Sequence, residues 1–256
     1  MNLWDLIARA DARALAASGL ACLDRCLPPA PEGDGPEPLR PLWASCEDGT
    51  AWAARLAAAR ETVAALAPPA APVIPTQAPS AAPGPSAGSV PLSGPGSGTG
   101  FGPGSGTGFG PGEPLARIRA MLDAAPETFE AGPLRVWADA CSLLSLEIHR
   151  RADRPSTPDT DTPAADAADA VGPDGAPGSG ERETLELLRI GSAGAEADAG
   201  PLVAGELRRQ RELLEILAET AGSPGSGAGL RRALDHSTEG RRVLRAVMSR
   251  RARNQA

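Results

Sequence analysis

The chain of 256 residues carries a formal net charge of −7 and contains 30 glycines, 27 prolines, four Trp, three Phe and no Tyr. All 25 basic residues are arginine, which excludes enzymes that depend on a P-loop lysine, a kinase-type lysine or a Schiff-base lysine. Because aromatic residues are scarce, a core must consist of Leu, Ala and Val; the Ala, Gly, Pro and Arg bias is typical of a high-GC bacterial genome.

Residues 1–67 predict an N-terminal helical hairpin. Asn2 can cap a helix that runs to about Leu27, with apolar residues spaced three and four apart. A turn of helix is expected at residues 39–43. Thr50 can then cap a second long helix. One face of that helix carries Trp52, Leu56, Ala59, Val63 and Leu66.

Residues 68–112 contain no charged side chain and repeat GPGSGTGF twice. Prolines at eight-residue intervals remove the backbone donors that a sheet would need, and the glycines favour a flexible coil. The segment therefore predicts a Pro/Gly-rich disordered linker that tethers the parts on either side.

Residues 113–152 predict a helical segment. A short helix begins at Glu113 and Pro114, and Pro126 ends it. A longer helix then begins at Gly132 and Pro133 with a strongly periodic apolar seam, flanked by charged pairs at i,i+4 spacing. The seam consists of Leu134, Trp137, Cys141, Leu144 and Ile148; the pairs are Arg135 with Asp139 and Glu147 with Arg151.

The remainder divides into an acidic disordered linker, 153–180, and a C-terminal helical region with a basic tail, 181–256. The linker has six Asp against one Arg. Helical patterns follow at residues 183–190, at 201–221 and from about Ser237, where Val243, Leu244, Val247 and Met248 are expected to be buried. The last 30 residues hold eight Arg and two acidic residues.

These elements predict an all-α protein built from short helical bundles or helical hairpins, interrupted by two long disordered low-complexity linkers. The sequence leaves open whether the helices form one core or two, and the oligomeric state.

No window of about 18 residues is free of charges or prolines, and charged residues interrupt the first apolar run. We therefore expect neither a transmembrane span nor a signal peptide, and a cytoplasmic location.

Four cysteines are the candidate metal ligands. Cys22 and Cys26 lie one helical turn apart, and Cys46 and Cys141 could complete a tetrahedral site. Cysteine also serves as a small buried hydrophobic residue, and Cys141 falls within an apolar seam. We predict structural burial and no metal; a Cys-ligated metal protein is the alternative.

Neither histidine is placed for catalysis. We expect His149 to be partly exposed near a helix end. Asp235, His236 and Ser237 are consecutive, so their side chains point in different directions and cannot form a relay, and we expect them in a turn at a helix start. The sequence has no HExxH or paired-carboxylate motif. We predict no catalytic residue, no cofactor and no enzyme activity.

The primary hypothesis is a non-enzymatic helical adaptor or scaffold that mediates protein–protein interaction or self-association through its apolar seams. The candidate partner-binding residues are Leu134, Trp137, Leu144, Ile148, Leu207, Leu214 and Leu217.

The alternative function is a nucleic-acid-associated regulatory protein that uses the arginine-rich tail, since arginine side chains bind phosphates. The candidate contacts for an anionic partner are Arg241, Arg242, Arg245, Arg250, Arg251 and Arg253. A solvated helix face, docking on the chain's own acidic linker and an anionic membrane are the other interpretations of this charge.

Overall fold

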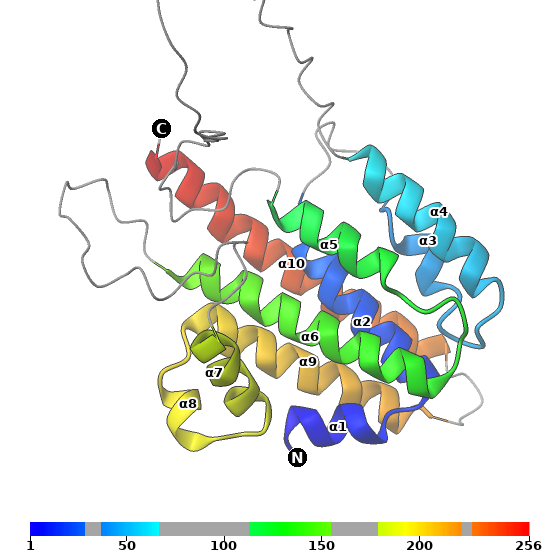
Figure 1. Cartoon of the computed structure of the whole chain (residues 1–256), viewed down its shortest axis with the longest axis horizontal. Helices are drawn as coiled ribbons and strands as arrows, with labels where there is room; N and C mark the ends of the chain where they lie inside the picture. The colour runs from blue at the N-terminus through cyan, green and yellow to red at the C-terminus, as the bar shows by residue number, and fades with distance from the viewer. Residues whose placement is uncertain (29–36, 67–112, 155–178, 222–226, 256) are drawn as a thin grey trace, which may run out of the picture.

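A computed structural model describes residues 1–28, 37–66, 113–154, 179–221 and 227–255. Within these ranges the chain is helical and has no strand, which confirms the predicted all-α class (Figure 1). The predicted linkers 68–112 and 153–180 lie outside the described residues, except at the ends of the second, where α6 and α7 reach into it.

The described residues form ten helices. They are α1 Leu3–Arg9, α2 Ala12–Cys26, α3 Arg40–Trp43, α4 Trp52–Ala65, α5 Glu113–Asp123, α6 Ala131–Asp153, α7 Ser179–Arg189, α8 Ala193–Ala197, α9 Pro201–Glu219 and α10 Gly227–Gln255.

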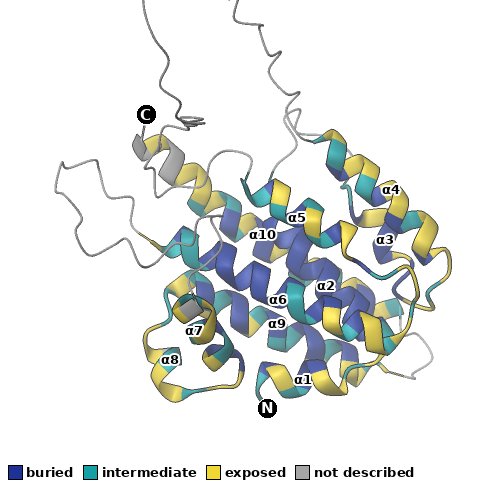
Figure 2. Cartoon of the chain, viewed as in Figure 1, coloured by how far each residue is buried: buried dark blue, intermediate teal, exposed yellow. Residues whose placement is uncertain are grey.

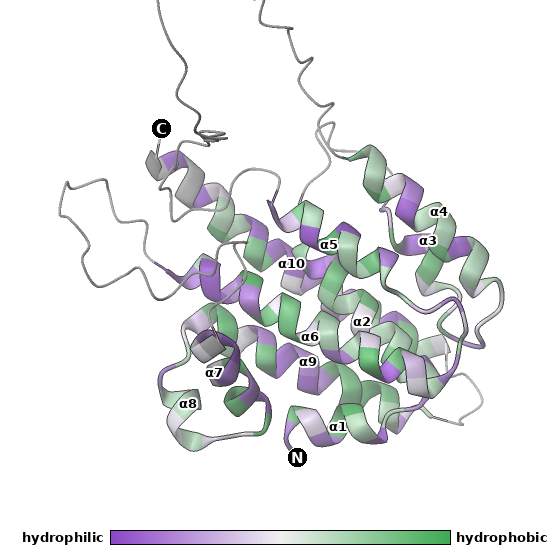
Figure 3. Ribbon diagram, in the orientation of Figure 1, coloured by the Kyte–Doolittle hydropathy of each residue, from purple (hydrophilic) through white to green (hydrophobic). Residues whose placement is uncertain are grey.

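Helix α2 is the centre of the molecule. Every residue from Arg13 to Cys26 is buried, and Figure 2 shows α2 in dark blue behind the outer helices. It packs chiefly against α6 and α10 and also contacts α9 and α5. Its Ala-, Leu- and Cys-rich sequence fits this position, because a helix that is apolar on all sides requires cover on all sides (Figure 3).

One hydrophobic core includes residues from the three segments 1–67, 113–152 and 181–256. The two long helices of residues 1–67 pack mainly on other partners, α2 on α6 and α10, and α4 on α5. Helices α9 and α10 pack against each other and against α2. The question of one core or two, which the sequence left open, is answered in favour of one for the described helices.

Two predictions for the helices of residues 1–67 differ from the structure. The first helix is broken at Ala10 because the Asp11 side chain accepts a hydrogen bond from Ala14 N at 2.7 Å and starts α2 as a new helix. Asn2 caps α1 as predicted. The predicted Thr50 cap is wrong: the N-cap of α4 is Ala51, in the left-handed region with φ 56°.

Helix α10 also differs from its prediction. It begins at Gly227, ten residues before Ser237, and runs for 29 residues, so the trio Asp235, His236 and Ser237 lies within a helix and not in a turn at its start. Of the four apolar residues expected to be buried, Leu244 is; Val243 and Val247 are half-buried, and Met248 is exposed.

The charged residues of α6 connect neighbouring helices. Asp139 forms an ion pair with Arg189 of α7, and Glu147 with Arg117 of α5. The sequence predicted partners for Asp139 and Glu147 within α6, at i,i+4 spacing. Non-local packing decides these pairs, because α5 places an arginine beside Glu147 and α7 places one beside Asp139.

None of the helices described is both long and apolar enough to cross a membrane.

Tryptophan side chains join α4 and α5 to the bundle. Trp52 donates from Nε1 to Pro126 O at 2.7 Å, and Trp137 from Nε1 to Met121 O at 2.9 Å. The two rings meet edge to face with centroids 6.1 Å apart. These indoles therefore bury apolar area and also satisfy backbone carbonyls near the end of α5.

Helices α2 and α6 approach closely at Gly19. A β-carbon built on Gly19 would lie 2.5 Å from the Trp137 ring. We predict that Gly19→Ala lowers the unfolding free energy by about 1 to 3 kcal/mol, because the ring must move within a packed core. The matched control is Gly132→Ala in α6, where a β-carbon meets no atom within 4 Å. Urea denaturation followed by circular dichroism measures both; equal effects would contradict the close approach.

Candidate functional site

The buried carboxylate of Glu206 in α9 is the centre of a polar network inside the bundle. Arg25 of α2 donates to it from Nη2 at 2.6 Å and from Nε at 2.8 Å. Ser145 of α6 and Gln210 of α9 each donate to Oε1 at 2.8 Å. Three helices thus contribute donors to one carboxylate.

The ionised form of Glu206 is strongly favoured. Burial alone would raise its pKa, but the charge of Arg25, the hydrogen bonds from Arg25 and Gln210 and the nearby His149 ring lower it to about 2. The same pairing raises the pKa of Arg25 despite its burial. The pair is therefore ionised throughout the neutral range.

His149 also belongs to this network. Its Nδ1 lies 2.8 Å from Ser145 O, and its Nε2 lies 3.6 Å from Glu206 Oε2. The ring is buried, so the expectation of a partly exposed histidine is wrong; α6 continues to Asp153 and α9 covers the ring. Burial lowers the pKa of His149 more than the nearby Glu206 carboxylate raises it, and the charges of Arg25 and Arg209 lower it further.

A second buried pair joins α2 to α10. Arg241 of α10 donates to Asp24 Oδ1 at 3.0 Å and also forms an ion pair with Glu37, while Ser237 Oγ lies 3.2 Å from Asp24 Oδ2. Burial raises the pKa of Asp24 although Arg241 opposes this. The pKa of Asp24 is raised and that of Glu206 is lowered, because Asp24 shares its arginine with Glu37, whereas Glu206 accepts hydrogen bonds from Arg25, Ser145 and Gln210.

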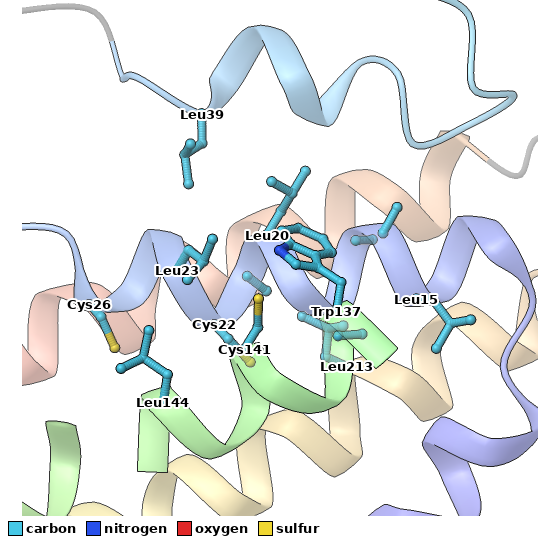
Figure 4. Close-up of a cluster of buried hydrophobic side chains, with 14 of the residues drawn as sticks. Leu15, Leu20, Cys22, Leu23, Cys26, Leu39, Trp137, Cys141, Leu144 and Leu213 are labelled. Atoms are coloured by element: carbon cyan, nitrogen blue, oxygen red, sulfur yellow. The ribbon is translucent and has the colours of Figure 1, made fainter. Parts of the chain in front are cut away.

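The four cysteines are buried thiols. Cys22, Cys26 and Cys141 lie at the α2–α6 interface (Figure 4), whereas Cys46 contacts Leu42 O beyond α3. Burial raises the pKa of all four, that of Cys22 to about 12. No group of three or more His, Cys, Asp or Glu among the described residues is arranged to hold a metal ion.

All seven residues predicted to bind a partner are buried in the chain's own core: Leu134, Trp137, Leu144, Ile148, Leu207, Leu214 and Leu217. In this structure α6 and α9 pack against each other and against α2. That any of them contacts a second molecule stays a prediction.

The six tail arginines have different environments. Arg241 is buried and occupied by Asp24 and Glu37. Arg245 is half-buried, whereas Arg242, Arg250 and Arg253 are exposed. The side chain of Arg251 lies outside the described part of the structure. The trio Asp235, His236 and Ser237 forms no relay, since His236 faces Glu212 and Ser237 faces Asp24.

Sequence reasoning missed a group of exposed apolar side chains, which we call the α1–α7 surface: Trp4 on α1, Val136 on α6, Leu187 on α7 and Ile190 directly after α7. These side chains are 54%, 74%, 40% and 49% exposed. The Arg189–Asp139 ion pair places the end of α7 beside α6, and Gly191 lies beside Asn2 at the start of α1. A signal was available, because Trp4 lies off the Leu3 and Ile7 stripe and Val136 off the α6 seam.

A small cavity of about 40 Å³ lies between α4 and α5, lined in part by Arg60, Val63 and Leu122. Small-molecule sites enclose roughly 300 to 1,000 Å³, so this cavity has room for water and not for a substrate.

Comparison of the chain with protein-family models, with curated proteins and with solved structures found no match.

The Arg25–Glu206 pair yields a stability prediction. Glu206→Gln leaves the Arg25 charge buried without its counter-ion, so we expect a loss of about 3 to 5 kcal/mol in unfolding free energy. The double variant Arg25→Met, Glu206→Leu removes both charges and should lose less than Glu206→Gln alone. Urea denaturation provides the comparison; a double variant at least as unstable as the single one would show that the unpaired charge is not the main cause of the instability.

The shifted pKa of His149 predicts a pH dependence. A histidine whose folded-state pKa is lowered binds fewer protons when folded, so stability falls as pH decreases through the unfolded value of about 6.5. The lowered pKa of Glu206 affects stability at lower pH: the stability it contributes is lost as pH falls from about 4.5 to 2. Arg25, which also lies near His149, keeps its charge throughout.

We expect His149→Gln to flatten the decline in unfolding free energy between about pH 7 and 5. His236→Gln is the matched control, because His236 is the only other histidine, is less buried and should contribute less. The slope of stability against pH is read from urea denaturation at several pH values. A slope unchanged by His149→Gln, or changed more by His236→Gln, would refute the assignment.

Proposed function

We propose that this protein is a helical adaptor or scaffold that binds another protein, or a second copy of itself, on the α1–α7 surface. The observation that carries the proposal is the exposure of Trp4 on α1, two residues after Asn2, which Gly191 approaches just beyond the end of α7. Exposed apolar side chains scattered singly are ordinary, but several gathered on adjoining elements mark an interaction surface.

The chemistry of the α1–α7 surface suits a protein partner. Tryptophan is the residue type most enriched among interface hot spots, because its large ring buries much area at a small entropic cost. Leu187 lies in the last turn of α7, and Ile190 directly follows that helix three residues later, so the two side chains can face the same partner. A helix on the partner could lay its own apolar stripe along this face.

The surrounding contacts hold this surface in a fixed shape. Leu3, Leu6 and Ile7 anchor α1 in the core, so Trp4 stands on a well-packed helix. Leu185 and Leu188 anchor α7 in the same way, and Arg189 pairs with Asp139. A preorganised surface loses little conformational entropy on binding. The proposed role is non-enzymatic, and the cytoplasmic location stays a prediction.

The test replaces two anchors, Trp4→Ser with Ile190→Ser, in the full chain. Self-association is measured by sedimentation, and recovery of partners by quantitative co-purification from the native cell. We expect at least one specific association to weaken about 30-fold, as truncation of a hot spot costs about 2 kcal/mol or more.

The matched control is Met248→Ser, which removes another exposed apolar side chain at the C-terminal end of α10. Thermal unfolding of both variants checks that the bundle is intact. If every association, with itself or with other proteins, survives the double substitution unchanged, the proposal fails.

A further inference from the structure

The C-terminal turns of α10 extend beyond the packed part of the bundle. Helix α10 has 29 residues and is about 43 Å long, whereas its central neighbour α2 has 15 residues. Leu244 is the last α10 residue known to be buried; the described side chains that follow it are half-buried or exposed. Figure 1 shows this end of α10, in red, at the edge of the molecule.

Arginines line the solvent-facing side of this helix. Arg231, Arg242 and Arg253 are spaced by 11 residues, which is three helical turns with a drift of about 20°, so all three share one face. Arg250 adjoins Arg253 on that face, and both are exposed. The buried side of α10, with Ala233, Ser237 and Leu244, is turned toward the bundle.

The acidic residues of α10 divide this face into two halves. Asp235 and Glu239 lie on the same side as Arg231 and Arg232, and Glu239 also pairs with Arg242 at 3.4 Å. No Asp or Glu follows Glu239 in the sequence. Positive charge is therefore concentrated between Arg242 and Arg253.

Arg245 extends this positive surface toward the bundle. It is half-buried, and its Nε makes no hydrogen bond within the described structure. Burial and the nearby Arg241 lower the pKa of Arg245. An incoming anion would relieve the repulsion between these two guanidinium groups, since Arg241 itself is fully occupied by Asp24 and Glu37.

We propose that the C-terminal half of α10, from Arg242 to Arg253, binds the phosphate backbone of double-stranded nucleic acid. Guanidinium groups form paired hydrogen bonds with phosphate oxygens, and a projecting helix fits the major groove of a duplex. This site lies on a different element from the α1–α7 surface, so this proposal can be tested independently of the adaptor role.

Two features favour a duplex over other polyanions. No Trp, Tyr or Phe follows Trp137 in the sequence, so this region has no aromatic side chain to stack on the bases of a single strand. A membrane-binding helix turns a broad apolar side outward, whereas Leu244 faces the bundle and Met248 is the one exposed large apolar side chain among the described residues of α10.

The test compares two double variants of the full chain. Arg250→Gln with Arg253→Gln removes two charges from the proposed site. Arg231→Gln with Arg232→Gln removes the same charge from exposed positions on the same helix, beside Asp235 and Glu239. Fluorescence anisotropy with a short labelled DNA duplex is measured between about 50 and 200 mM salt, the range in which phosphate contacts weaken strongly.

We expect the wild-type protein to bind with a negative salt slope. The Arg250, Arg253 variant should lose about two units of that slope and at least about tenfold in affinity, whereas the Arg231, Arg232 variant should stay close to wild type. Both variants should unfold at the wild-type temperature, because all four side chains are exposed.

Three results would overturn the proposal. One is the absence of salt-dependent duplex binding by the wild-type protein. Another is an equal loss of duplex affinity in the two double variants, which would mean that the net charge of the protein alone explains the effect. The third is binding to phosphatidylserine vesicles in preference to the duplex, with the same dependence on Arg250 and Arg253, which would assign this surface to anionic membranes instead.

Discussion

The ion pair between Arg25 and Glu206 constrains the whole bundle. Both groups are buried, and a charge in a low-dielectric interior is tolerated only when its counter-ion and hydrogen-bond donors are correctly placed. Because the donors come from α2, α6 and α9, a shift of any of these helices along its axis would leave a buried charge unpaired. Leucine and alanine contacts tolerate such sliding far better. The polar network therefore specifies the register, while the apolar residues supply most of the favourable burial.

Small side chains make this arrangement possible. The β-carbon that Gly19 lacks would meet the Trp137 ring, and the one that Gly240 lacks would meet Arg25 Cδ at 2.5 Å. The second contact lies beside the ion pair itself, so the absence of a side chain at Gly240 makes room for the buried guanidinium. Close helix packing and charge placement thus both depend on glycines, Gly19 in α2 and Gly240 in α10.

The sequence predicted the helices well and their partners poorly, for a physical reason. Apolar spacing is a local property, and it correctly identified the buried faces of α4 and α6. The partner of a charged side chain depends on what another segment brings beside it, so the local pairing of Asp139 and the exposure of His149 were predicted wrongly. Glu206 did carry a signal, since it shares a helical face with Gln210, Leu213 and Leu217, but hydropathy alone treats a glutamate as a surface residue.

The rigid core also fixes the distance between the two proposed surfaces. Asp24 and Arg241 tie α10 to α2, while Arg189 and Asp139 tie α7 to α6, which packs on α2 in turn. The N-terminus and the C-terminal end of α10 lie on different sides of the molecule (Figure 1). A partner held on the α1–α7 surface would therefore be presented at a constant position relative to a duplex bound by α10. Because such a bridge raises the local concentration of one ligand near the other, even weak contacts at each surface would suffice for a specific assembly.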